Sequence, residues 1–103
     1  MKRTLLVTPA AEAEIAAAAA WYYDIFATLA TRFLDEVSVV LESITSTPTR
    51  YPLWPGLPLI RKARLNMFPY YAVFTTDDRM INVLAMAHSK RHPHYWQRRI
   101  DPT

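Results

Sequence analysis

All three histidines of this chain, His88, His92 and His94, lie in the single stretch HSKRHPHYWQRR, residues 88–99. Lysine and arginine side chains surround them, together with two aromatic residues. Side chains of these types can bind a metal ion, act as acid and base on RNA, or contact a protein partner. They can also form a merely solvated charged surface. The elements that position them decide between these uses.

The spacing of the histidines does not predict a metal site. Pro93 separates His92 from His94 in irregular backbone, and no acidic residue follows until Asp101. The chain has no cysteine, which excludes thiolate zinc sites, disulfides and cysteine nucleophiles. We therefore expect no metal and no other cofactor. His88 is expected to be a structural residue at a strand end, and His92 is a candidate acid–base group because the pKa of histidine lies near neutrality.

Charge is distributed unevenly along the chain. Residues 1–49 hold three basic and six acidic residues, a net charge of −3, whereas residues 50–103 hold nine basic and three acidic residues, a net charge of +6. A basic half in a small domain indicates an anionic partner, either nucleic acid or an acidic protein segment, or else a solvated surface.

Length and composition predict one folded domain over residues 1–103, because 51% of the residues are apolar. The N-terminal apolar run is interrupted at Thr8-Pro9, so it does not predict a signal peptide. The later run 15–23 is shorter than the roughly 20 residues that span a bilayer. We expect a soluble, cytoplasmic protein without a membrane partner.

The first half of the chain predicts a short strand and two helices. RTLLVT, residues 3–8, is typical of a strand, and Thr8 and Pro9 are suited to the N-cap and first position of a helix. No glycine or proline follows before residue 46, and one helix of that length is improbable in so small a domain. We place a break near residues 25–28, with Thr28 capping the second helix.

Each predicted helix has one apolar face. The second helix repeats apolar residues at helical spacing, and the first shows a similar stripe, so the pair should form an antiparallel hairpin. Trp21 is expected in the hairpin core beside this stripe. The faces are Ile15, Ala19, Tyr22 and Phe26 in the first helix, and Leu29, Phe33, Val37, Val40, Leu41 and Ile44 in the second.

The second half predicts a loop and three strands. Residues 46–58 hold four prolines and the only glycine, which predicts an ordered loop without strand or helix. Strands are expected at 60–65, 70–76 and 80–88, the last two forming a hairpin. The fold class is therefore α+β, with the order β-α-α-β-β-β and the helical hairpin packed on one face of a small, mainly antiparallel sheet.

Several residues of the second half have two interpretations. Lys62 and Arg64 share one face of the predicted strand 60–65, where they either protect an exposed edge or contact a partner. Trp54 and Trp96 are interface anchors if they are exposed, and structural residues if they pack against the sheet.

Five segments together resemble the RelE/ParE superfamily of bacterial type II toxins, over nearly the whole chain. The resemblance implies the α+β fold described above, a cognate antitoxin that folds on the toxin in a hetero-oligomer, and a role in growth arrest and plasmid stabilisation. The segments are VTPAAEAEI (7–15), AAAAAWYYDIFATLATRFLDEVSVVLESI (16–44), TPTRYPLWPG (47–56), IRKARLNMFPYYAVF (60–74) and INVLAMAHSKRHPHYW (81–96).

The superfamily has two known activities, and the sequence departs from the pattern of one. RelE-like members cut mRNA on the ribosome, whereas ParE-like members inhibit DNA gyrase. Tyr71 stands where RelE-like members place an arginine, His92 replaces a usual acidic residue, and Ala27 to Ala30 replace the usual proline and glycine of the inter-helix turn. By resemblance, the catalytic residues of a nuclease would be Lys62, Arg64, Lys90, Arg91, His92 and Tyr95.

The missing arginine favours a ParE-like toxin that inhibits DNA gyrase and is neutralised by an antitoxin. The alternatives are a ribosome-dependent mRNA endonuclease, which is an enzyme, and a non-toxic domain that binds nucleic acid or a protein partner. The expected contacts to a target or antitoxin are Arg61, Lys62, Arg64, Lys90, Arg91, Trp96, Arg98 and Arg99.

Overall fold

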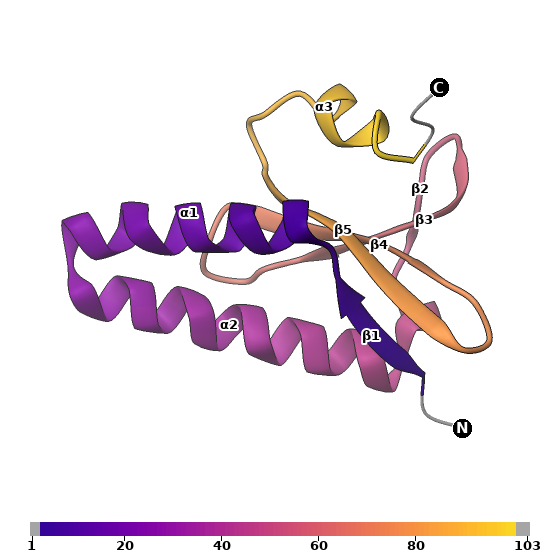
Figure 1. The fold of residues 1–103 in the computed structure, drawn as a ribbon, viewed down its shortest axis with the longest axis horizontal. Coiled ribbons are helices and arrows are strands. Elements are labelled where there is room, and N and C mark those ends of the chain that lie inside the picture. Colours follow the sequence, from indigo (N-terminus) through magenta and orange to yellow (C-terminus); the bar gives the residue numbers. More distant parts are fainter. Residues whose placement is uncertain (1–2, 101–103) are drawn as a thin grey trace.

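The computed structural model describes residues 3–100, and a five-stranded sheet with a helical hairpin dominates it (Figure 1). The α+β class and the order of the main elements are confirmed, with a two-residue strand and a short C-terminal helix added to them. The elements are β1 (Thr4–Val7), α1 (Pro9–Ile25), α2 (Ala27–Ser46), the 3-10 helix η1 (Pro48–Arg50), β2 (Leu53–Trp54), β3 (Leu57–Arg64), β4 (Tyr70–Thr76), β5 (Met80–His88) and α3 (His94–Gln97).

Helix α1 begins where the sequence predicts. Thr8 is the N-cap, and its hydroxyl accepts a hydrogen bond of 3.2 Å from the Ala11 amide, while Pro9 occupies the first helical position. Thr8 also directly follows β1, and its amide donates to the Val83 carbonyl on β5. The same residue therefore stops the strand and starts the helix.

The hairpin turns at a single residue. Phe26 has extended backbone angles, φ −150° and ψ 133°, and serves as both the C-cap of α1 and the N-cap of α2. The predicted break is thus confirmed, but the expectation that Thr28 caps α2 is wrong, since α2 already begins at Ala27. No side chain caps the start of α2, because phenylalanine has no acceptor to offer.

Only part of the predicted hairpin core is buried. Phe33, Val37 and Ile44 pack under α2 as expected, and Tyr22 packs against them from α1. Trp21 and Phe26 were expected in this core, but each is 66% exposed. Both residues belong to the closed end of the hairpin, which extends beyond the strands in Figure 1.

The sheet has the strand order β1-β5-β4-β3-β2, and only β1 and β5 run parallel. The predicted strands 70–76 and 80–88 are confirmed without change as β4 and β5. The expectation of a loop without strands over 46–58 is wrong. A turn at Gly56, with φ of +80°, reverses the chain so that β2 pairs with the start of β3.

Strand β3 is therefore not an open edge along its whole length. Leu53 pairs with Arg61, and the Lys62 amide bonds the Pro52 carbonyl, so β2 and the residue before it cover this strand up to position 62. Beyond that point β3 pairs only with β4. The expectation of an exposed edge over 60–65 is correct only for its last residues.

The two faces of the sheet hold separate apolar clusters. The hairpin covers the larger one, in which the rings of Tyr22, Phe33, Phe68 and Tyr70 contact each other edge to face. The other face carries a smaller cluster, covered by α3 and the β2 turn. Its buried members are Ile60, Tyr71, Val73, Ala85, Ala87 and Trp96.

Candidate functional site

The basic residues of β3 point to opposite faces of the sheet. The Arg61 guanidinium donates to the Tyr51 carbonyl at 2.6 Å and the Thr49 carbonyl at 3.4 Å, so it ties down the loop after α2. Lys62 lies on the face with α3, and Arg64 shares that face by strand alternation. Of these three, Arg64 is the one whose side chain is exposed.

The Lys62 ammonium rests on two aromatic rings. Its Nζ lies 5.1 Å from the Trp54 ring centroid and 4.9 Å from that of Tyr71, and the two rings are stacked at 5.7 Å. Such contacts hold a cation by the negative face of the ring. Lys62 is therefore held against the rings at the surface of the smaller cluster, where it is half-buried.

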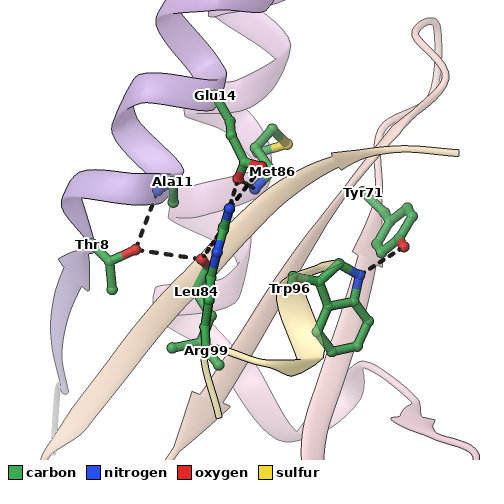
Figure 2. A network of polar contacts seen from close by, with 8 residues as sticks. All are labelled: Thr8, Ala11, Glu14, Tyr71, Leu84, Met86, Trp96 and Arg99. Atoms are coloured by element: carbon green, nitrogen blue, oxygen red, sulfur yellow. Dashed lines mark hydrogen bonds and ion pairs between the residues drawn. The ribbon is translucent and has the colours of Figure 1, made fainter. Parts of the chain in front are cut away.

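Trp96 locks α3 onto the sheet. Its side chain is fully buried, and its indole N–H donates to the Tyr71 hydroxyl at 3.0 Å (Figure 2). The expectation that Trp96 contacts a target or antitoxin at an accessible surface is therefore wrong, because the side chain belongs to the core. Trp54 is half-buried and packs edge to face against it at 4.9 Å.

On its other side α3 is held by a partly buried ion pair. The Glu14 carboxylate accepts the Met86 amide at 3.0 Å and two Arg99 nitrogens at 3.0 and 3.3 Å (Figure 2). The side chains of Arg99 and Glu14 are 29% and 16% exposed. This network joins α1, β5 and the C-terminal segment.

A bulge in β5 prepares one acceptor of this network. Val73 pairs with Ala85 and Phe74 with Val83, so Leu84 has no opposite residue on β4. Its carbonyl accepts from Arg99 at 3.0 Å and from the Thr8 hydroxyl at 3.4 Å (Figure 2). The bulge thus leaves the Leu84 carbonyl available to accept the hydrogen bond from Arg99.

Tyr95 lies between two guanidinium groups. The guanidinium carbon of Arg91 is 3.5 Å from the Tyr95 ring centroid, and that of Arg99 is 5.1 Å away. Burial raises the pKa of the Tyr95 hydroxyl far above its ordinary value, and the nearby Glu14 carboxylate raises it further as acceptor and as negative charge. The two arginines oppose this shift without cancelling it.

The histidines serve the local backbone. His88 Nδ1 accepts the Lys90 amide at 3.1 Å, in line with a structural role at the strand end, and His92 Nδ1 accepts the His94 amide at 3.0 Å. The rings of His92 and His94 are 6.2 Å apart. Within residues 3–100, no three histidine or acidic side chains come together as metal ligands.

The remaining candidate cations are spread around α3. Lys90, Arg91, His92 and Arg98 are exposed, whereas Arg99 is held by Glu14. Glu14 was not among the predicted site residues. The signal was available, because Glu14 lies three residues after Ala11 and four before Ala18, on the buried face of an alanine-rich helix.

In the described part of the chain, no helix combines the length and apolar character needed to cross a bilayer. No protein-family model and no curated protein sequence matches the chain. A solved chain entitled "Chromosomal ParDE TA system from P. aeruginosa" is similar in structure, with a TM-score of 0.75 over 86% of this chain and 98% of that chain. The two sequences are 18% identical, so the likeness establishes that the two chains share a fold.

Proposed function

We propose that this protein is the toxin of a type II toxin–antitoxin pair and that it acts by binding a protein target, DNA gyrase, rather than by cutting mRNA. The fold shared with a chain of a ParDE system supports the toxin assignment. One observation favours binding over cleavage: two of the side chains that a RelE-like nuclease would use, Lys62 and Tyr95, are engaged in separate structural contacts.

Tyr95 is poorly suited to acid–base work. Metal-free RNA cleavage needs a base for the 2′-hydroxyl and an acid for the leaving oxygen, each with a pKa near the operating pH. The strongly raised pKa of Tyr95 makes it a weak acid and keeps it protonated at neutral pH. Its ring also contacts the guanidinium groups of Arg91 and Arg99.

The cationic cradle of a nuclease is also incomplete. Lys62 lies against Trp54 and Tyr71, and Tyr71 occupies the position of a phosphate-stabilising arginine. Because Tyr71 is buried and accepts the Trp96 N–H, an arginine could not replace it without burying a charge. Loss of one electrostatic group commonly lowers a rate by roughly 10²- to 10³-fold.

One apolar groove is our candidate site for the antitoxin. A hollow of about 430 Å³ lies between α2 and the β3–β4 turn, with Leu29, Val39, Met67 and Phe68 among its lining residues. Val39 is 66% and Met67 81% exposed, so these side chains are free to be covered. The turn follows directly after Arg64, where β2 no longer covers β3.

We therefore propose that a disordered antitoxin segment folds onto this groove and continues past Arg64. Arg64→Glu should weaken antitoxin binding, and the loss should be larger at low salt, where screening is least. Arg50→Glu is the matched control, because Arg50 is an exposed cation outside the groove. Equal affinity of the two variants at low salt, measured by calorimetry, would remove Arg64 from the interface.

Expression in bacteria tests the mode of action. A gyrase inhibitor should cause filamentation, the DNA-damage response and accumulation of cleaved DNA, while mRNA stays intact. Early arrest of translation with mRNA cut at ribosome-occupied codons would identify a nuclease instead. Unimpaired growth would favour a partner-binding domain without toxicity.

A further inference from the structure

A second hollow lies on the opposite side of the hairpin from the antitoxin groove. Its volume is about 270 Å³, and it is bordered by α1, the end of β5 and the segment that leads into α3. Glu14, Ala17 and Trp21 contribute from α1, and Arg91 and Tyr95 from the C-terminal segment. None of the residues that line the antitoxin groove lines this second hollow.

Arg91 is the uncompensated charge in this hollow. Within residues 3–100, the one carboxylate–cation pair within 4.0 Å joins Glu14 to Arg99, so Glu14 is neutralised and Arg91 is left without a carboxylate. The Tyr95 ring supports the Arg91 guanidinium at 3.5 Å. A guanidinium over an aromatic face can keep its N–H groups available for a planar acceptor.

Two neighbours complete the binding chemistry. His88 Nδ1 accepts the Lys90 amide, so the neutral ring carries its hydrogen on Nε2, and His88 is one of the residues that line the hollow. Trp21 stands at the rim, 66% exposed, next to the small side chain of Ala17 on the same helix face. The hollow is thus lined by two hydrogen-bond donors, Arg91 and His88, and by an apolar recess at Ala17 and Trp21.

We propose that this hollow binds an internal aspartate or glutamate side chain of a protein partner, with an apolar neighbour of that residue lying over Ala17 against Trp21. That the ligand belongs to a protein rests on the proposed function. One guanidinium matches the single charge of one carboxylate, whereas a phosphate dianion would leave one negative charge without a partner, because Arg99 is already paired with Glu14. The donors are side chains, whereas a chain-terminal carboxylate is typically captured by backbone N–H groups.

Titration of the full-length, ¹⁵N-labelled protein tests the proposal. The probe is the capped dipeptide acetyl-leucyl-glutamate amide, and acetyl-leucyl-glutamine amide is its uncharged match. We expect a saturable shift of the Trp21 indole resonance with the first probe and none with the second. The indoles of Trp54 and Trp96 should not move, and a shift centred on Trp54 would place the site near Lys62 and overturn the proposal.

Two variant pairs locate the ligand. Arg91→Gln should weaken the glutamate probe by about 10-fold or more, because it removes a charged hydrogen-bond partner, whereas Arg98→Gln removes an exposed cation outside the hollow and should leave affinity unchanged. Ala17→Leu should fill the recess and abolish binding, while Ala16→Leu, on an exposed position outside it, should not. Retained affinity in Arg91→Gln and Ala17→Leu would refute the site.

Further probes separate the ligand classes. Acetyl-phenylalanine carries a terminal carboxylate, and thymidine monophosphate represents nucleic acid. Tighter binding of either at Trp21 than of the glutamate probe would overturn the assignment to an internal acidic side chain. The titration needs no gyrase, so a protein that binds the probe but leaves supercoiling unaffected would contradict the proposed target and keep the hollow.

Discussion

The two faces of the sheet are covered in different ways. On one face, two helices of 17 and 20 residues bury a continuous core in which Phe33 and Phe74 are fully inaccessible. On the other face, a four-residue helix and a two-residue strand cover the smaller cluster. The hairpin face relies on apolar area, whereas the α3 face relies on a few directed contacts, chiefly those of Trp96 and Glu14.

This difference separates the main source of stability from most of the exposed positive charge. Apolar burial supplies most of the favourable free energy of folding. The α3 face and its borders carry the exposed cations Arg64, Lys90, Arg91 and Arg98. Substitutions among these exposed cations should therefore leave unchanged the apolar area under the hairpin, which maintains the fold.

Phe33→Ala should have the largest effect, because it removes a fully buried ring that contacts three other aromatic rings. We expect a loss of about 3–5 kcal/mol in the free energy of unfolding, measured by urea denaturation. Leu34→Ala, whose side chain is 42% exposed on the same helix, should cost less than half as much. Similar losses would show that the hairpin face does not dominate stability.

Glu14→Gln should act locally on the α3 face. It weakens the bidentate contact with Arg99, and hydrogen bonds to charged groups contribute about 1.5–3 kcal/mol. Amides of residues 95–100 should therefore exchange faster with solvent, while the core strands keep their protection. Glu12→Gln, an exposed change on the same helix, is the control. Uniformly faster exchange across β4 and β5 would contradict local undocking.

Alkaline pH should produce the smallest and most gradual effect. The folded-state pKa of Tyr95 is raised, so its contribution is complete below the unfolded value near 10 and declines as the pH rises further. Burial also raises the pKa of Tyr22 and Tyr70 on the hairpin face. Tyr95→Phe should flatten the decline of stability above about pH 10. An unchanged slope would show that the decline comes from Tyr22 and Tyr70 instead.

The sequence was informative where periodic patterns decide the structure. Strands 70–76 and 80–88 and the cap at Thr8 were predicted correctly, because alternation and capping are local signals. The exposure of Trp21 and the burial of Trp96 were not predicted. Both depend on where the sheet ends relative to the hairpin and α3, which is a property of tertiary packing.

The candidate site was less predictable for the same reason. The sequence identified the basic residues, but Arg61 and Lys62 turn to opposite faces and are held by different partners. The role of Glu14 depends on Arg99, 85 positions away in the chain. The bulge at Leu84 that exposes an acceptor to this arginine has no marker such as glycine in the sequence.

We propose that this protein inhibits gyrase by binding and does not cut mRNA. The most direct test adds the purified protein in parallel to DNA supercoiling by gyrase and to mRNA held on programmed ribosomes. We predict inhibited supercoiling and intact mRNA, with supercoiling restored by the antitoxin. Codon-positioned cuts in the mRNA with undisturbed supercoiling would contradict the account.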